Sequence, residues 1–118
     1  MRHHKNTRTL GRTKRQRVAL LRGLARSLVL EGGITTTAAK AKELRPYMER
    51  LVTASKVNTL QSKRIISERL GNAADAVKRL HDTIAPRYMS RAGGYTRVIK
   101  LGRIGKRVSE SARIEFVQ

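Results

Sequence analysis

Apolar residues first recur at regular spacing after residue 13, and the spacing is that of a helix. The apolar positions are Val18, Leu21, Leu24, Ala25, Leu28 and Val29, which would line one helical face. Thr13 and Gln16 fit a capping box, in which each side chain accepts a hydrogen bond from the other residue's backbone N–H. Gly32 and Gly33 follow, and glycine accepts the left-handed conformation that ends many helices. The pattern predicts a first helix between Thr13 and Gly32.

A short β-branched segment, residues 34–37, separates this helix from a second apolar stripe. The segment reads Ile-Thr-Thr-Thr and predicts a strand, and its last residue, Thr37, can cap the following helix. The stripe consists of Ala41, Leu44, Met48, Leu51 and Val52. Pro46 lies within it, although proline in a helix interior costs about 3 kcal/mol. The second helix therefore either kinks at Pro46 or starts later than Thr37 suggests.

Two shorter helical patterns follow a break at residues 57–59. The third predicted helix covers about residues 61–70, and its inward-facing positions are Ile65, Ile66 and Leu70. Asn72 is expected to cap the fourth helix, whose apolar stripe is Ala73, Ala76, Val77, Leu80 and Ile84. Pro86 is expected to end that helix, because proline disfavours the helical conformation of the residue before it.

Two alternating segments near the C-terminus, residues 95–101 and 112–117, predict strands. A basic loop that contains glycine, residues 102–111, joins them. On the first of these strands neither face is purely apolar, and we expect Ile99 and Leu101 to reach the core while Arg97 emerges at the other end. The order α-β-α-α-α-β-β predicts an α+β fold, with a small three-stranded sheet packed with helices.

Residues 1–12 lack any such periodicity. Leu10 is the only large aliphatic residue between Met1 and Val18, and a segment with so little apolar surface to bury is expected to be an extended arm. Residues 13–118 are expected to form a single globular domain, in line with a chain of 118 residues. No run resembles a transmembrane segment or the apolar region of a secretory signal, so the sequence predicts a cytosolic protein without a membrane partner.

Positive charge extends the prediction from the fold to the partner. Lysine and arginine number 27 against eight acidic residues, for a formal net charge of +19. Residues 1–30 hold nine bases and no acid, residues 87–107 hold seven bases and no acid, and residues 31–86 hold ten bases and six acids. A polyanion stabilises a protein with so much like charge by neutralising it, so we expect a nucleic-acid partner.

The residue types that catalysis or cofactor binding needs do not occur together. The chain has no cysteine, and His3, His4 and His81 are not at metal-ligand spacing. The acids are scattered, and no phosphate-loop or nucleophile motif occurs. We therefore expect no enzyme activity, no cofactor, no metal and no small-molecule substrate. Aromatic residues make up 3% of the chain, which disfavours single-strand binding by base stacking.

Two groups of basic residues outside any glycine turn are candidates for phosphate contacts. The first lies in the arm and at the start of the first helix, and comprises Arg2, His3, Lys5, Arg8, Arg12, Lys14, Arg15 and Arg17. Cations at a helix N-terminus oppose the helix dipole, and bound phosphate would relieve that cost. A solvated basic tail is the alternative. The second group lies in the second helix and comprises Lys40, Lys42 and Arg45, which an ordinary amphipathic helix face explains as well.

A third group surrounds two adjacent glycines. Gly93 and Gly94 lack side chains, so the backbone can adopt positive φ there and approach a phosphate closely. Successive N–H groups in such a turn can form an anion-binding nest. Arg87, Arg91 and Arg97 can bond phosphate oxygens with paired donors. A plain turn before a strand is the alternative, and the acid-free surroundings favour phosphate.

Three segments resemble a known family in order and spacing: MRHHK at residues 1–5, ITTTAAKAKELR at residues 34–45 and RAGGYTRVIK at residues 91–100. They are similar to the bacterial large-subunit ribosomal protein seventeen family over essentially the whole chain. The resemblance implies a structural protein, not an enzyme, that binds large-subunit ribosomal RNA near the exit of the nascent-peptide tunnel, beside other ribosomal proteins. It adds Tyr95 to the RNA-facing candidates.

Two other classes of protein are alternatives. A nucleoid-type DNA-binding protein would carry similar charge but would show no preference for folded RNA. A membrane-surface peptide is disfavoured, because the central helices mix acids with bases and tryptophan is absent. We expect a ribosomal protein that neutralises RNA charge and does not form a homo-oligomer.

Overall fold

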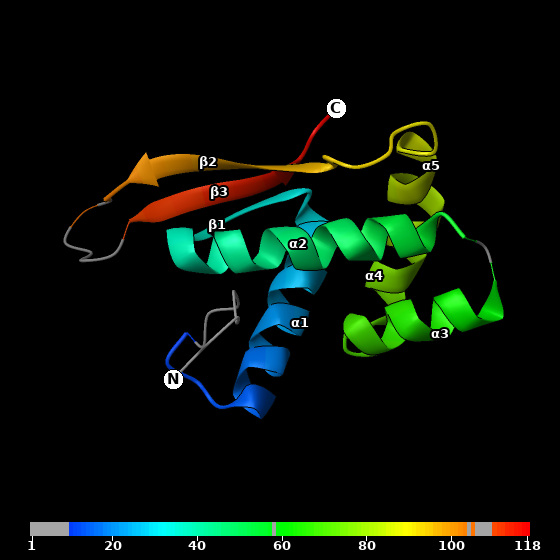
Figure 1. Cartoon of the computed structure of the whole chain (residues 1–118), viewed down its shortest axis with the longest axis horizontal. Helices are drawn as coiled ribbons and strands as arrows, with labels where there is room; N and C mark the ends of the chain where they lie inside the picture. The colour runs from blue at the N-terminus through cyan, green and yellow to red at the C-terminus, as the bar shows by residue number, and fades with distance from the viewer. Residues whose placement is uncertain (1–9, 58, 104, 106–109) are drawn as a thin grey trace.

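The computed structural model describes residues 10–57, 59–103, 105 and 110–118. Along the chain the elements are α1 (Lys14–Glu31), β1 (Gly33–Thr37), α2 (Ala38–Ser55), α3 (Leu60–Arg69), α4 (Ala74–Arg79), the π-helical segment η1 (Leu80–Ile84), α5 (Ala85–Arg87), β2 (Thr96–Gly102) and β3 (Ser111–Phe116). The predicted α+β class is confirmed, and so is the three-stranded sheet (Figure 1). Most of the predicted N-terminal arm, residues 1–9, lies outside the described residues.

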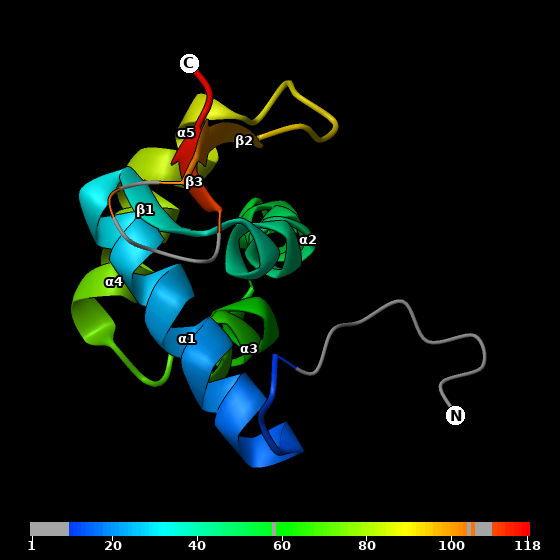
Figure 2. The ribbon, with the colours of Figure 1, turned by 90° about the vertical axis from the view of Figure 1, so that its left-hand side faces the viewer.

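The sheet has the order β1-β3-β2, and both pairs of strands are antiparallel. Helix α2 contacts all three strands, and α1 contacts α2, α4 and β1. Figures 1 and 2 both place α2 between α1 and strand β2. The long second helix is therefore the element that connects the sheet to the rest of the helical layer.

The hydrophobic core lies between the sheet and the helices. It includes Leu28 of α1 and Leu44 and Met48 of α2, each with no exposed surface. At the end near β2, the ring of Tyr88 lies 5.3 Å from that of Tyr95 and 6.5 Å from that of Phe116, measured between centroids. Three of the four aromatic residues of the chain thus meet at one end of the core.

The buried face of β2 differs from the expected one. Ile99 and Leu101 are 40% and 43% exposed, whereas Thr96 is buried and Val98 packs against the core. The register explains this face, because Val98 pairs with Ile114 of β3 and both must point to the same side of the sheet. Ile65 of α3 is also exposed, at 42%, although its neighbour Ile66 is buried as expected.

Helix α2 runs without interruption through Pro46. Its N-cap is Thr37, whose hydroxyl oxygen accepts a hydrogen bond from the backbone N–H of Lys40 at 3.3 Å. The alternative of a later start is therefore wrong. Proline removes the N–H that would bond the carbonyl of Lys42, and both Pro46 and Lys42 are exposed, so water can satisfy that carbonyl.

Two expected boundaries near the fourth helix are also corrected. Asn72 does not cap α4. It has a left-handed φ of 60°, and its N–H donates to the carbonyl of Ser67 at 2.7 Å, so it ends α3. Pro86 does not end the helical path, which continues to Arg87. A π turn precedes it, in which the Ala85 N–H bonds the carbonyl of Leu80. Pro86 lies in the first turn of α5, a position where proline is tolerated because its missing N–H is not needed.

Candidate nucleic-acid interface

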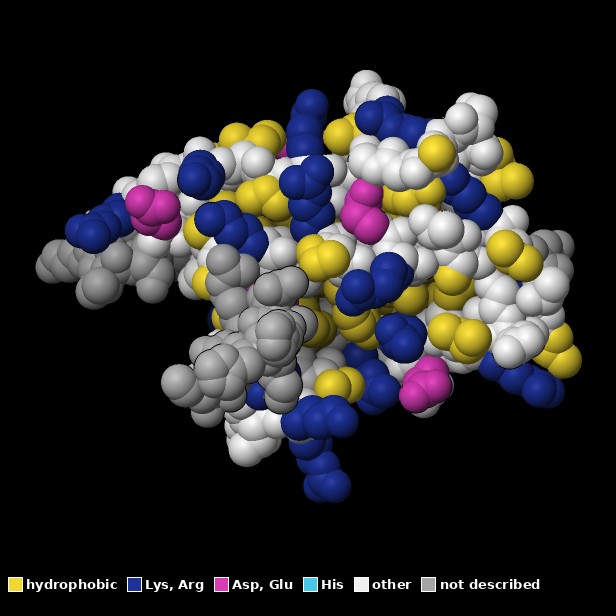
Figure 3. All heavy atoms as spheres, viewed as in Figure 1, with side chains coloured by type: hydrophobic (Ala, Val, Ile, Leu, Met, Phe, Trp, Pro, Cys, Tyr) yellow, Lys and Arg dark blue, Asp and Glu magenta, His cyan; other side chains and the backbone are white. Residues whose placement is uncertain are grey.

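Lysine and arginine side chains are spread over the face of the molecule shown in Figure 3, with few acidic groups between them. The exposed basic residues of the three candidate groups are Lys14, Arg15, Lys42, Arg45, Arg87, Arg91 and Arg97. Arg2, His3, Lys5 and Arg8 lie outside the described residues. The described candidate cations therefore lie on several elements: the start of α1, helix α2, α5 and the glycine turn with β2.

The start of α1 confirms the predicted cap. Thr13 and Gln16 form the capping box, with distances of 3.3 Å and 3.1 Å between the bonded atoms. Arg17 donates from Nη1 to the carbonyl of Arg12 at 3.0 Å, and Arg12 donates to the carbonyl of Leu10 at 2.7 Å. These two half-buried arginines hold residues 10–12 against the helix. The first turn contains no acidic residue, so its positive end is not neutralised within the helix.

The glycine turn has the backbone conformation expected of it. Gly93 has a φ of 140° and Gly94 a φ of 65°, values that side-chain-bearing residues adopt only at a cost. The exposed side chain of Arg91 folds back, and its Nε donates to the carbonyl of Gly93 at 3.1 Å. Among the described residues, no oxygen accepts a hydrogen bond from the N–H of Gly93 or Gly94. The turn is thus open to an outside acceptor at its two glycines.

An internal carboxylate occupies the N–H groups that follow the glycines. Glu49 of α2 accepts hydrogen bonds from the backbone N–H of Tyr95, from the backbone N–H of Thr96 and from the hydroxyl of Thr96, all at 3.1 Å. The expected anion-binding nest therefore holds the protein's own anion at residues 95 and 96. Glu49 is not among the residues predicted from sequence to form the interface, and the one local signal for it is that its face of α2 carries no second acid.

Tyr95 lies in the core and not at the surface. Its side chain is 1% exposed, and its hydroxyl lies 3.2 Å from the hydroxyl of Thr53 and donates to the carbonyl of Arg91 at 3.3 Å. Hydrogen bonding with Lys56, then with Thr53, lowers the pKa of Tyr95 below its ordinary value of 10.0. The direct RNA contact implied by the resemblance is therefore replaced by a role beneath the turn.

A shallow hollow lies between α2 and the glycine turn. Its lining includes Arg50, Val57 and Gly93. Arg50 is exposed and adds a cation beside the turn that the sequence analysis did not identify. At the other side of the turn, the guanidinium of Arg87 lies 5.9 Å from the ring centroid of Tyr88, a cation–π geometry that limits how far this side chain moves.

Arg97 of β2 and Arg113 of β3 both bond the carboxylate of Glu115. Nη2 of Arg97 donates to Glu115 at 2.9 Å, and Nε of Arg113 donates to the other oxygen of Glu115 at 3.1 Å. The Arg97 side chain is 58% exposed, and a guanidinium has five N–H donors. Arg97 can therefore keep this bond and still present donors to a phosphate.

The pKa of Glu115 should depend more on Arg97 than on Arg113. Hydrogen bonding by Arg97, followed by that of Arg113, holds this pKa below its ordinary value of 4.5. We expect Arg97→Ala to raise it more than Arg113→Ala does, as measured by an NMR titration of the Glu115 carboxyl. A larger rise in the Arg113 variant would contradict the assignment.

The same ion pairs make a pH-dependent contribution to stability. Because the folded-state pKa of Glu115 is lowered, its contribution is present above the pKa of the unfolded chain and is lost as pH falls through the folded-state pKa. Thermal melts of the unmodified protein and of Glu115→Gln should therefore differ at neutral pH and converge in acid. Curves that stay equally separated would show that Glu115 titrates normally.

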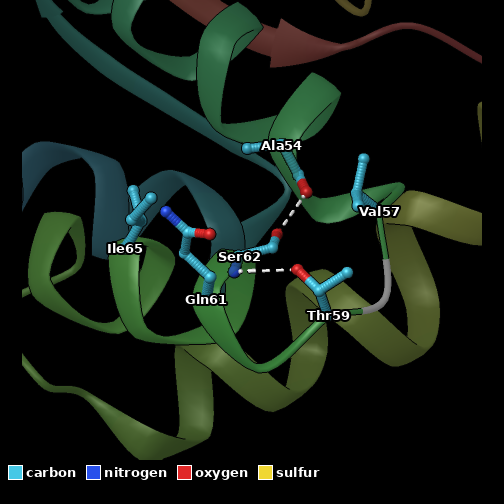
Figure 4. A pocket seen from close by; sticks show the side chains of 6 residues that line it. All are labelled: Ala54, Val57, Thr59, Gln61, Ser62 and Ile65. Atoms are coloured by element: carbon cyan, nitrogen blue, oxygen red, sulfur yellow. Dashed lines mark hydrogen bonds between the residues drawn. The ribbon is translucent and has the colours of Figure 1, made fainter.

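A second hollow, with a mostly apolar lining, lies between α2 and α3. Its lining consists of Ala54, Val57, Thr59, Gln61, Ser62 and Ile65 (Figure 4). The hydroxyl of Thr59 accepts from the N–H of Ser62 at 3.1 Å, and the hydroxyl of Ser62 donates to the carbonyl of Ala54 at 2.5 Å. Within the described part of the chain, no cluster of three or more acidic or histidine residues could hold a metal. No described helix is long and apolar enough to cross a membrane.

Comparison with known proteins relates the whole chain to one family. The family model described as Ribosomal protein L17 matches residues 20–117. The large ribosomal subunit protein bL17 of Gemmatimonas aurantiaca is 44% identical over 117 residues, which cover 99% of this chain and 98% of the relative. The protein of the same name from Sulfurihydrogenibium sp. is 48% identical over 120 residues, which cover 100% of this chain and 98% of the relative. The similarity therefore includes α1, α2 and the glycine turn.

Proposed function

Because the chain belongs to the ribosomal protein L17 family, we propose that it is a structural constituent of the large ribosomal subunit that binds ribosomal RNA. The observation that carries the RNA-binding part is the net charge of +19, displayed on a folded scaffold with few acids beside the candidate groups. The protein acts in the ribosome, in the cytoplasm, and has no catalytic role.

The mechanism we propose is charge neutralisation by cations held in place. Arg91 and Arg97 flank the glycine turn, both are exposed, and guanidinium groups bond phosphate oxygens with paired donors. Each cation that contacts a phosphate releases counterions into solution, which favours binding. Arg87 and the two glycines complete this part of the interface. Tyr95 contributes to this part of the interface from the core, beneath the turn.

The other parts of the interface follow from the remaining candidate groups. The cations at the start of α1 are not neutralised by acids in its first turn, and a phosphate there would complement the helix dipole. These residues are Arg12, Lys14, Arg15 and Arg17, together with Arg2, His3, Lys5 and Arg8 before them. On α2 the proposed contacts are Lys40, Lys42 and Arg45. Cations at separate places suit a protein that lies between RNA segments and holds them together.

The place of binding is also part of the proposal. The resemblance to the family implies a position near the exit of the nascent-peptide tunnel, beside other ribosomal proteins. Exposed apolar side chains such as Val57 and Leu60, which are 53% and 64% exposed, support contacts with protein as well as with RNA.

Sedimentation of a cell lysate tests the function directly. We expect the protein to travel with the large ribosomal subunit through a sucrose gradient and to leave it only in high salt, because its contacts are mainly electrostatic. Competition tests the alternative of a nucleoid-type protein. Large-subunit ribosomal RNA should displace a bound labelled RNA transcript far better than duplex DNA at equal phosphate concentration. Equal competition, or sedimentation with the nucleoid, would reject the proposal.

A further inference from the structure

We infer that Glu49 is a positioning residue for the RNA interface, and that it acts by holding the glycine turn in its binding conformation. The inference rests on the proposed function, because Glu49 bonds the protein's own backbone and can affect RNA binding only through the turn. Glu49 lies on α2, 46 positions before Tyr95 in the chain, and bonds two consecutive backbone N–H groups and one hydroxyl.

Glu49 is one of three side chains, on α2 and at its C-cap, that hold the segment from Arg91 to Thr96. Thr53 and Lys56 follow it by four and seven positions, a spacing that places all three on one face of a helix. Thr53 bonds the hydroxyl of Tyr95. Lys56 donates from Nζ to the carbonyl of Arg91, and the same Nζ lies 4.5 Å from the centroid of the Tyr95 ring. The turn is therefore fastened to one rigid helix at both of its ends.

The contacts on either side of Gly93 and Gly94 set the conformation of the turn, because the glycines themselves are conformationally free. Gly93 and Gly94 have φ values of 140° and 65°, and glycine loses more conformational freedom on ordering than any other residue. A free turn of this kind would place Arg91 and Arg97 at many relative distances. Pairing with β3 places Arg97 in the sheet, and Glu49 holds the two N–H groups that directly follow the glycines. With Arg91 held through Lys56, these contacts leave the two arginines at a set separation.

A carboxylate beside an RNA interface has a second, opposite effect, which is repulsion of phosphate. The two effects differ in sign. If Glu49 acted only through its charge, its removal would strengthen RNA binding. If it orders the turn, its removal weakens binding, because the apparent dissociation constant rises as the fraction of molecules in the competent conformation falls. The three hydrogen bonds engage the charge of Glu49 internally and favour the ordering effect.

The experiment compares four proteins for binding to a large-subunit ribosomal RNA transcript: the unmodified chain, Glu49→Ala, Glu49→Gln and Glu31→Ala. Glu31 is exposed at the end of α1, so its substitution removes the same charge without touching the turn. We expect Glu49→Ala to weaken binding about tenfold, as for a turn ordered one-tenth of the time. Glu49→Gln, which keeps an oxygen acceptor, should weaken it less. Glu31→Ala should bind as well as the unmodified chain or slightly better.

Two further readouts separate positioning from a general loss of structure. In Glu49→Ala the amide hydrogens of Tyr95 and Thr96 should exchange faster while those of α1 stay protected. The salt dependence should lose the contribution of about two phosphate contacts. Glu49→Gln serves for all measurements if the alanine variant does not fold. RNA binding by a folded Glu49→Ala that equals or exceeds that of Glu31→Ala would overturn the inference.

The outcomes also distinguish this inference from the proposed function. If Arg91→Ala and Arg97→Ala together leave RNA binding unchanged, the proposed interface at the turn is wrong whatever Glu49 does. If that double variant binds weakly and Glu49→Ala binds normally, the interface stands and only the role of Glu49 is wrong.

Discussion

The affinity of this protein for ribosomal RNA should fall by about 10³–10⁵-fold when the salt concentration is raised from about 50 to about 200 mM. That range corresponds to about 6–10 phosphate contacts, each of which releases counterions. Such a number is reasonable for a chain with 27 basic residues, many of them exposed. Filter binding or fluorescence titration with a large-subunit RNA transcript at four or more salt concentrations gives the slope.

The two arginines of the glycine turn provide an internal control for the dependence of RNA affinity on salt. Replacing Arg91 and Arg97 with alanine should lower the number of contacts by about two, whereas replacing Arg26, which is exposed and pairs with Asp75 at 3.6 Å, should leave it nearly unchanged. An affinity that hardly depends on salt would contradict charge neutralisation, even if the protein sediments with the ribosome.

Replacing Leu44 with alanine should destabilise the domain by about 2–5 kcal/mol, the range for buried leucines. Leu44 has no exposed surface and lies on α2, the helix that contacts all three strands as well as α1 and α3. The loss is a large part of the roughly 5–15 kcal/mol that stabilises a typical domain. Thermal unfolding followed by circular dichroism should show a midpoint lower by about 10–20 °C.

Leu60 provides the matched control for this substitution. It is a leucine at the start of α3 with 64% of its surface exposed, so Leu60→Ala should shift the midpoint by only a degree or two. Similar shifts in the two variants would mean that the core does not lie between α2 and the sheet. The affinity for a protein-free RNA transcript, measured well below the melting temperature, should be unchanged by Leu60→Ala.

The candidate interface shows where sequence patterns stop being informative. The arginines and glycines of the turn could be identified, because charge and residue type are visible in the sequence. Glu49 could not, since its partners are 46 and 47 positions away. The family resemblance placed Tyr95 among the RNA-facing candidates, whereas the fold buries its ring in the core beneath the turn.

Local interactions account for the elements that were predicted correctly. The capping box of Thr13 and Gln16, the cap at Thr37 and the apolar stripes of α1 and α2 all involve residues within a few positions of one another, so the sequence alone is sufficient to define them. The overall charge, and with it the class of partner, is equally a property of the chain without its fold.

Contacts between residues far apart in the chain determined the features that local patterns did not predict. Val98 faces the core and Ile99 the solvent because Val98 pairs with Ile114 of β3 and Ile99 with Arg113. Asn72 ends α3 in a left-handed conformation, and the helical path passes through a π turn before it reaches Pro86. Glu49 reaches the glycine turn because α2 lies beneath it. These choices depend on groups that are far apart in the chain, and only folding brings such groups within hydrogen-bonding distance.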